Sequence, residues 1–291
     1  MSLINPLTFI KYCQSKGVAV AAFNVHNMET IQAVTEAAAE EDAPVIIQTT
    51  PGTLKHAGIP YIAANVKVAA EQFDIPIALH VDHCESYEMI EQCIQYGYTS
   101  VMIDGSKLPY LQNVSLVNRV VQLAKCAGVA VEAELGRIGG VEDQLLVDLR
   151  EATFTVPEEA QTFVTATGVD TLAVAIGTAH GEYHGEPKLD FDRLVAIRNL
   201  VEIPLVLHGA SGVPDESIHK AISRGVSKIN IATELKNPMV VAIRRCLADN
   251  PKENDPRHYM GAAKEAVKKV VKEKIRLCGC NNLASEFRGI R

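Results

Sequence analysis

The sequence of 291 residues lacks the long apolar run that a membrane-spanning helix requires. Such a helix needs about 20 consecutive apolar residues, and the longest runs here are interrupted by His, Asp or Gly. The first residues, MSLINPLTFIKYCQ, also lack the basic region, apolar core and small-residue cleavage site of a secretory signal. We therefore expect a cytoplasmic protein with no membrane partner.

Positive charge is also scarce. The chain has 28 Lys and Arg against 35 Asp and Glu, a net charge of −7, and no Lys/Arg-rich stretch precedes residue 264. Because binding to a nucleic-acid backbone requires a basic surface stripe, we expect no nucleic-acid partner. A small phosphorylated substrate is still compatible with this charge, since backbone N–H groups can hold a phosphate.

Paired cysteine motifs are missing as well. The seven cysteines are odd in number and scattered, and the C-x-C of Cys278 and Cys280 has no second pair. This pattern favours neither a zinc ribbon nor a disulfide scaffold, and it agrees with the expected cytoplasmic location.

What the sequence does contain is a regular alternation of apolar runs and amphipathic segments. Most of the runs are near-continuous Val, Ile, Leu and Ala, which is typical of parallel strands buried on both faces. Eight such units followed by helical stretches predict an α/β fold, the (β/α)₈ or TIM barrel. The eight predicted strands cover residues 18–25, 43–50, 75–83, 100–105, 129–136, 171–177, 203–209 and 228–233.

A doubly wound sheet is the alternative fold, but NVHNMET follows the first predicted strand where that fold would carry G-x-G-x-x-G. We expect one barrel domain over residues 1–291, with a C-terminal helical extension over about 235–280. Its last helix is predicted to open at Asp255-Pro256. Residues 136–156 are too long and Gly-rich for a plain turn, and we expect them to form a mobile lid.

Polar residues collect at the ends of the predicted strands, where a barrel carries its functional groups. Burying carboxylates and imidazoles is costly unless they are paired, so this many at the ends of apolar strands indicates that they share one site. The set comprises Asn24, Asp82, His83, Asp104, Glu134, His180, His208 and Asn230.

Three of these residues, His83, His180 and His208, could supply a His₃ zinc site with an open fourth position. The alternative for each histidine taken singly is a structural core or loop residue. The Gly/Ser/Thr-rich segments 209–211 and 230–233 suit a phosphate. The alternative there is ordinary helix capping by Ser211 and Thr233.

Seven motifs occur in the order found in one enzyme family: AAFNVHNMET, HVDH, SVMIDGS, VEAELGRIGG-VED, AVAIGTAHG, PLVLHGASG and KINIATELK. On them the chain resembles the class II, metal-dependent ketose-bisphosphate aldolases over its whole length. The stretches TPGTLKHAG, VEAELGRIGGVED and NDPRHYM make it most similar to the tagatose-1,6-bisphosphate aldolases of that family.

The resemblance implies one catalytic Zn²⁺ on His83, His180 and His208, with Asp104 and Glu134 as accessory metal-site acids. It implies that Asp82 exchanges the proton of the C4 hydroxyl, and that Glu142 exchanges a proton at the enediolate carbon. A monovalent cation (Na⁺ or K⁺) near the phosphate is also implied. The residues expected to bind substrate are Asn24, Gly181, Gly209, Ala210, Ser211, Asn230, Ile231, Ala232 and Thr233.

The expected activity is cleavage of D-tagatose 1,6-bisphosphate to dihydroxyacetone phosphate and D-glyceraldehyde 3-phosphate. The alternatives are a fructose-1,6-bisphosphate aldolase of class II, a non-catalytic accessory barrel subunit, and a zinc hydrolase, whose His-x-His is missing from the first predicted strand. A Schiff-base mechanism is disfavoured, because no lysine ends the strand at 171–177 and Lys228 opens its strand at the opposite end.

We expect a homodimer or homotetramer, and the resemblance adds a possible non-catalytic companion subunit. Arg257 and residues 49–53 are the candidates for holding the second phosphate.

Overall fold

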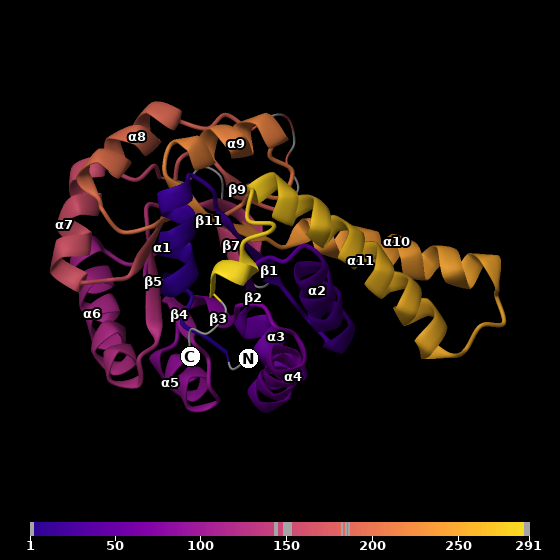
Figure 1. The fold of residues 1–291 in the computed structure, drawn as a ribbon. Coiled ribbons are helices and arrows are strands. Elements are labelled where there is room, and N and C mark those ends of the chain that lie inside the picture. The colour runs from indigo at the N-terminus through magenta and orange to yellow at the C-terminus, as the bar shows by residue number, and fades with distance from the viewer. Residues whose placement is uncertain are drawn as a thin grey trace.

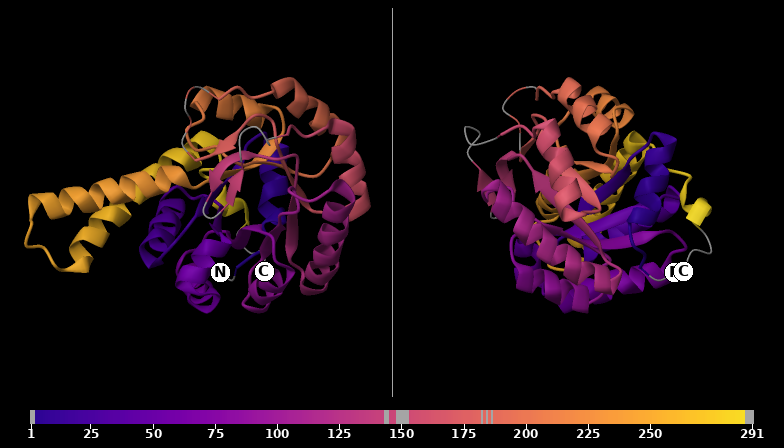
Figure 2. Two further views of the ribbon diagram at one scale, coloured as in Figure 1. Left: turned by 180° about the vertical axis from the view of Figure 1, so that it is seen from behind. Right: turned by 90° about the vertical axis from the view of Figure 1, so that its left-hand side faces the viewer.

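The computed structural model describes residues 3–142, 145–147, 153–181, 183, 185 and 187–287. Eight parallel strands close into a barrel and helices surround it, which confirms the predicted fold class (Figures 1 and 2). Around the barrel the strands follow the order β1-β11-β10-β8-β5-β4-β3-β2. Their bounds are β1 Val20–Asn24, β2 Val45–Thr49, β3 Ile77–Cys84, β4 Ser100–Ile103, β5 Ala130–Leu135, β8 Thr171–Val174, β10 Leu205–Leu207 and β11 Val226–Ile231.

Helices alternate with these strands, and their ends follow local sequence signals. Asn27 caps α2 (Met28–Glu40) through a reciprocal capping box with Thr30. Gly128 and Gly168, in the left-handed region, end α6 (Tyr110–Ala127) and α7 (Pro157–Thr167). The helices are α1 Leu7–Lys16, α2 Met28–Glu40, α3 Pro51–Ala57, α4 Ile59–Gln72, α5 Tyr87–Gln95, α6 Tyr110–Ala127, α7 Pro157–Thr167, α8 Phe191–Leu200, α9 Asp215–Ser223, α10 Thr233–Asp249 and α11 Pro256–Cys278, with a short 3₁₀ helix at Ala284–Phe287.

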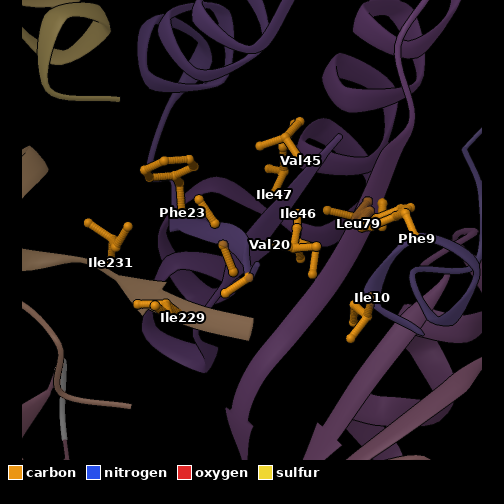
Figure 3. Packing of buried hydrophobic residues seen from close by; sticks show 14 of the residues in the cluster. Phe9, Ile10, Val20, Phe23, Val45, Ile46, Ile47, Leu79, Ile229 and Ile231 are labelled. Atoms are coloured by element: carbon orange, nitrogen blue, oxygen red, sulfur yellow. The ribbon is translucent and has the colours of Figure 1, made fainter. Parts of the chain in front are cut away.

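The core lies inside the barrel and between the strands and the helices. Every residue of the barrel strands is buried, as their near-continuous apolar sequences predict. The first helix, α1, lies across the end of the barrel where the strands begin (Figure 1). Its Phe9 and Ile10 belong to the same buried cluster as Val20 and Ile46 (Figure 3). Buried polar side chains, among them Asp82, His83 and His208, lie at the opposite end, where the strands finish.

The C-terminal extension is a pair of long helices, α10 and α11, that projects from the barrel as a hairpin (Figures 1 and 2). The helix α11 also packs against α2, where Lys264 and Lys268 pair with Glu36. In the part of the chain that the structure describes, no helix is long and apolar enough to cross a membrane.

The segment at 136–156 is more regular than the loop predicted from its glycines. Its strands β6 (Gly139–Glu142) and β7 (Leu145–Val147) pair antiparallel, and β6 also pairs in parallel with β9 (Ala179–His180). The backbone of Glu142 ends β6, but the Glu142 side chain lies outside the described residues, as do residues 143–144 and 148–152. The lid therefore stays a prediction.

Candidate active site

Three histidines meet where the barrel strands end. His83 lies on β3, His208 directly follows β10, and His180 lies on β9. Each of the three residues offers one ring nitrogen, and these three nitrogens lie within 4.8 Å of one another. The His83 Nε2 and the His208 Nδ1 are 2.8 Å apart. Three converging imidazole nitrogens form the donor set that zinc prefers, so these residues fit a metal ion.

A local irregularity in β3 brings Asp82 and His83 to the same site. Consecutive strand residues normally face opposite sides, but the pairing of β3 with β4 shifts register between Val81 and Cys84. His83 has a φ of +47°, a conformation that costs a non-glycine residue about 1–3 kcal/mol. This bulge lets both side chains reach the barrel interior, where Asp82 is fully buried.

The orientation of His83 is fixed by an acid from the next strand. The His83 Nδ1 lies 3.0 Å from the Asp104 Oδ2, which leaves its Nε2 for the histidine group. Burial alone would raise the pKa of Asp104, but the hydrogen bond with His83 and that from the Ser106 N–H hold it well below its usual range. Asp104 is thus a carboxylate that fixes the orientation of the His83 ring, as such acids do for metal-binding histidines.

His208 is oriented by Glu132, which sequence reasoning missed. The His208 Nε2 lies 2.9 Å from the Glu132 Oε1, and the Glu132 Oε2 lies 2.8 Å from the Lys228 Nζ. Burial lowers the pKa of His208, so the neutral ring donates from Nε2 and leaves Nδ1 facing His83. Burial alone would raise the pKa of Glu132, but Lys228 and the bond with His208 lower it well below its usual range.

A signal for Glu132 was present in the sequence. It precedes Glu134 by two residues on β5, so both carboxylates face the barrel interior. The Glu134 Oε2 lies 3.7 Å from the His208 Nδ1 and has no hydrogen-bond partner in the described structure. Burial and the nearby Asp104 raise the pKa of Glu134 well above its usual range. An unpartnered carboxylate oxygen beside three imidazoles supports the fit to a cation.

Asp82 is held by side-chain amides from three other strands. The Asn24 Nδ2 and the Gln48 Nε2 each donate to its Oδ2 at 3.1 Å, and the Asn230 Nδ2 donates to its Oδ1 at 3.0 Å. Asn24 and Asn230 were predicted to bind substrate, and their amides contact Asp82. Gln48 was missed, although a polar residue near the end of the apolar run at 43–50 was visible.

Beside the histidines lies a small pocket that brings most of the predicted substrate-binding residues together. The first turn of α10 opens into it, and the N-terminus of a helix favours an anion. Gly209, with a φ of +63°, lets the backbone turn there. The lining residues are His180, Gly181, Gly209, Ala210, Ser211, Asn230, Ala232 and Thr233. Asn24 does not line this pocket, and the side chain of Ile231 packs in the core.

The helix ends exclude the alternative of helix capping. Ser211 and Thr233 are not helix caps, because the N-cap residues of α9 and α10 are Pro214 and Ala232. Arg257 does not reach the barrel mouth of its own chain. It is mostly exposed and pairs with Asp255 in the first turn of α11. The helices α10 and α11 meet at the end of the hairpin that lies farthest from the barrel (Figure 1).

The other candidates for the second phosphate, residues 49–53, lie at the end of β2 and the start of α3. Thr50 caps α3 by accepting a hydrogen bond from the Thr53 N–H, and the Thr53 hydroxyl lies 2.9 Å from the His26 Nδ1.

Comparisons with known proteins agree with this geometry. The family model described as fructose-bisphosphate aldolase class-II matches residues 5–283. The crystal structure of the YdjI aldolase from Escherichia coli K12 is 34% identical, with a TM-score of 0.86, over 97% of this chain and 99% of that one. A fructose-bisphosphate aldolase from Campylobacter jejuni is 25% identical, with a TM-score of 0.82, over 97% of each chain. The chain therefore belongs to the class II fructose-bisphosphate aldolase family and is an aldolase.

Proposed function

We propose that this aldolase is zinc-dependent and cleaves D-tagatose 1,6-bisphosphate into dihydroxyacetone phosphate and D-glyceraldehyde 3-phosphate. The observation that carries the chemistry is the meeting of His83, His180 and His208 beside the fully buried Asp82 and the small pocket at the start of α10. Tagatose specificity rests on the stretches TPGTLKHAG, VEAELGRIGGVED and NDPRHYM. The second candidate is fructose 1,6-bisphosphate, which the matching family model favours by its description.

Cleavage requires a base for the C4 hydroxyl. In the proposed step, Asp82 takes the hydroxyl proton, the C3–C4 bond breaks, and its electron pair passes to C3 as an enediolate. The amides of Asn24, Gln48 and Asn230 aim the two oxygens of Asp82, so that the carboxylate needs little reorganisation when it accepts the proton. Zinc at the three histidines would supply the Lewis acidity that stabilises the negative charge.

The remaining roles follow from position. The phosphate of the dihydroxyacetone half would bind in the pocket formed by residues 209–211 and the first turn of α10. Glu142 would then return a proton to C3. Lys228 is not available as a Schiff-base lysine, because its ammonium is buried against Glu132. We also propose a cytoplasmic homodimer or homotetramer, with a companion subunit and a Na⁺ or K⁺ ion near the phosphate as further components.

Substrate choice is tested by steady-state cleavage of both epimers with zinc-loaded protein, measuring dihydroxyacetone phosphate with a coupled dehydrogenase. We expect kcat/KM for tagatose 1,6-bisphosphate to exceed that for the fructose epimer by at least about tenfold, or roughly 1.4 kcal/mol of discrimination. The reverse ratio would assign the fructose epimer. Cleavage of neither substrate by protein that holds zinc would overturn the proposal in favour of an accessory subunit.

The role of Glu142 has a separate test. In Glu142→Ala, exchange of the C3 proton of dihydroxyacetone phosphate with solvent should fall by at least as much as cleavage, with the zinc content unchanged. Glu158→Ala, in the first turn of α7, is the control and should exchange normally. Unchanged exchange in Glu142→Ala would assign the proton transfer to another residue.

A further inference from the structure

The chain holds His180 differently from the other two histidines of the proposed metal site. His83 lies on barrel strand β3, and His208 directly follows barrel strand β10. The strand β9, which carries His180, lies outside the closed barrel and pairs with β6. The distance between His180 and His208 therefore depends on contacts other than the hydrogen bonds of the barrel.

One hydroxyl joins the residues next to these two histidines. The Tyr183 hydroxyl accepts a hydrogen bond from the Ala179 N–H at 2.8 Å and donates one to the Gly209 carbonyl at 2.7 Å. Ala179 directly precedes His180, and Gly209 directly follows His208. Both contacts are to the backbone, so the hydroxyl fixes the two chain segments rather than the two rings.

The packing around this hydroxyl leaves the segments little freedom. A Cβ added at Gly209 would lie 2.6 Å from the Ala179 oxygen, so the two backbones are in direct contact. The Tyr183 ring packs against the core and lies beside Gly212. Burial raises the pKa of Tyr183 above its already high ordinary value, and the hydroxyl donates to the Gly209 carbonyl.

We propose that Tyr183 is a positioning residue that sets the separation of His180 and His208 and thereby the affinity of the site for zinc. The inference rests on the proposed function, because it requires a metal ion on these histidines. The same contact reaches the small pocket at the start of α10, since His180, Gly181 and Gly209 line it. Tyr183 thus connects the metal ligands with the phosphate pocket.

The test measures zinc affinity in metal-free protein, by titration against a chromophoric chelator, so that it does not depend on catalysis. Tyr183→Phe keeps the ring and removes both hydrogen bonds. We expect it to bind zinc about 10–100-fold more weakly, the usual effect of losing a group that supports a metal ligand. Tyr110→Phe is the matched control, because the Tyr110 hydroxyl has no partner in the described structure, and it should bind zinc like wild type.

A double-mutant cycle separates positioning from general destabilisation. In a His180→Ala background, Tyr183→Phe should cause no further loss of zinc affinity, because the group that it positions is gone. An equal loss in both backgrounds, or a wild-type dissociation constant for Tyr183→Phe, would overturn the inference. Failure of wild-type protein to bind zinc would instead overturn the metal site itself.

A second variant covers the case in which Tyr183→Phe does not fold. Gly209→Ala keeps the hydroxyl but forces the two segments apart, so it should also weaken zinc binding. Wild-type affinity in Gly209→Ala would contradict the proposed role of this contact.

Discussion

Replacing Lys228 by methionine tests the buried ion pair that Lys228 forms with Glu132, next to His208. Glu132 and Lys228 are each 1% exposed, and their Nζ–Oε2 distance is 2.8 Å. Removing one partner of such a pair leaves an uncompensated charge in the barrel, which typically costs about 3–5 kcal/mol. Natural domains are stable by only about 5–15 kcal/mol, so the loss should be easy to measure.

The assay is urea unfolding of metal-free protein at pH 7, because bound zinc would add its own stabilisation. Lys107→Met is the matched control. Its ion pair with Glu85 has a similar length of 2.9 Å but is largely exposed, so it should cost less than about 1 kcal/mol. In the double variant Lys228→Met/Glu132→Gln both charges are gone, and we expect recovery of at least about 2 kcal/mol relative to Lys228→Met.

Two results would refute this reasoning. If Lys228→Met cost no more than Lys107→Met, the pair would not be holding a buried charge. If the double variant were less stable than Lys228→Met, Glu132 would stabilise the barrel through its other contacts rather than through Lys228. Those contacts are His208 and the Thr171 hydroxyl.

Three further outcomes are expected. Asp82→Asn should retain zinc while turnover falls by about 10²–10⁴, the usual scale for a positioned acid or base; wild-type turnover would remove Asp82 from the mechanism. Gly140→Ala should weaken zinc binding, because its Cβ would overlap the His180 backbone; a wild-type dissociation constant would show that β6 does not position that ligand. Hydrogen bonds from Lys268 and Lys272 lower the pKa of Glu40. In urea unfolding at pH 7, Glu40→Gln should lower the free energy of unfolding by less than about 1 kcal/mol. This difference should vanish as the pH falls below 4.5, the ordinary pKa of the unfolded chain, and through the lower pKa of the folded protein. A difference that does not depend on pH would contradict the pairing.

The barrel was predictable because its strands are buried on both faces and therefore read as continuous apolar runs. Polar residues that end those runs, such as Asp82 and His208, were found by the same logic. Glu132 and its ion pair with Lys228 were missed because the charge of Glu132, inside a strand, is balanced by a residue 96 positions away. No local sequence pattern predicts that pairing. The two-residue spacing from Glu134 does place Glu132 on the interior face of β5.

The short strands β6, β7 and β9 escaped prediction for a different reason. Gly139 and Gly140 indicate a loop by propensity, yet Gly140 is needed in β6 because the His180 backbone packs directly on it. The place of Arg257 could not be read from the sequence either, since it depends on where the α10–α11 hairpin points.

The most direct test of the central claim is cleavage activity as zinc is returned to metal-free protein, with zinc content measured in parallel. We predict no cleavage without metal and full recovery at one zinc per chain. His208→Ala should lose both the zinc and the activity, whereas the exposed His219→Ala should keep both. Full cleavage by metal-free wild-type protein, or by His208→Ala without zinc, would contradict the account.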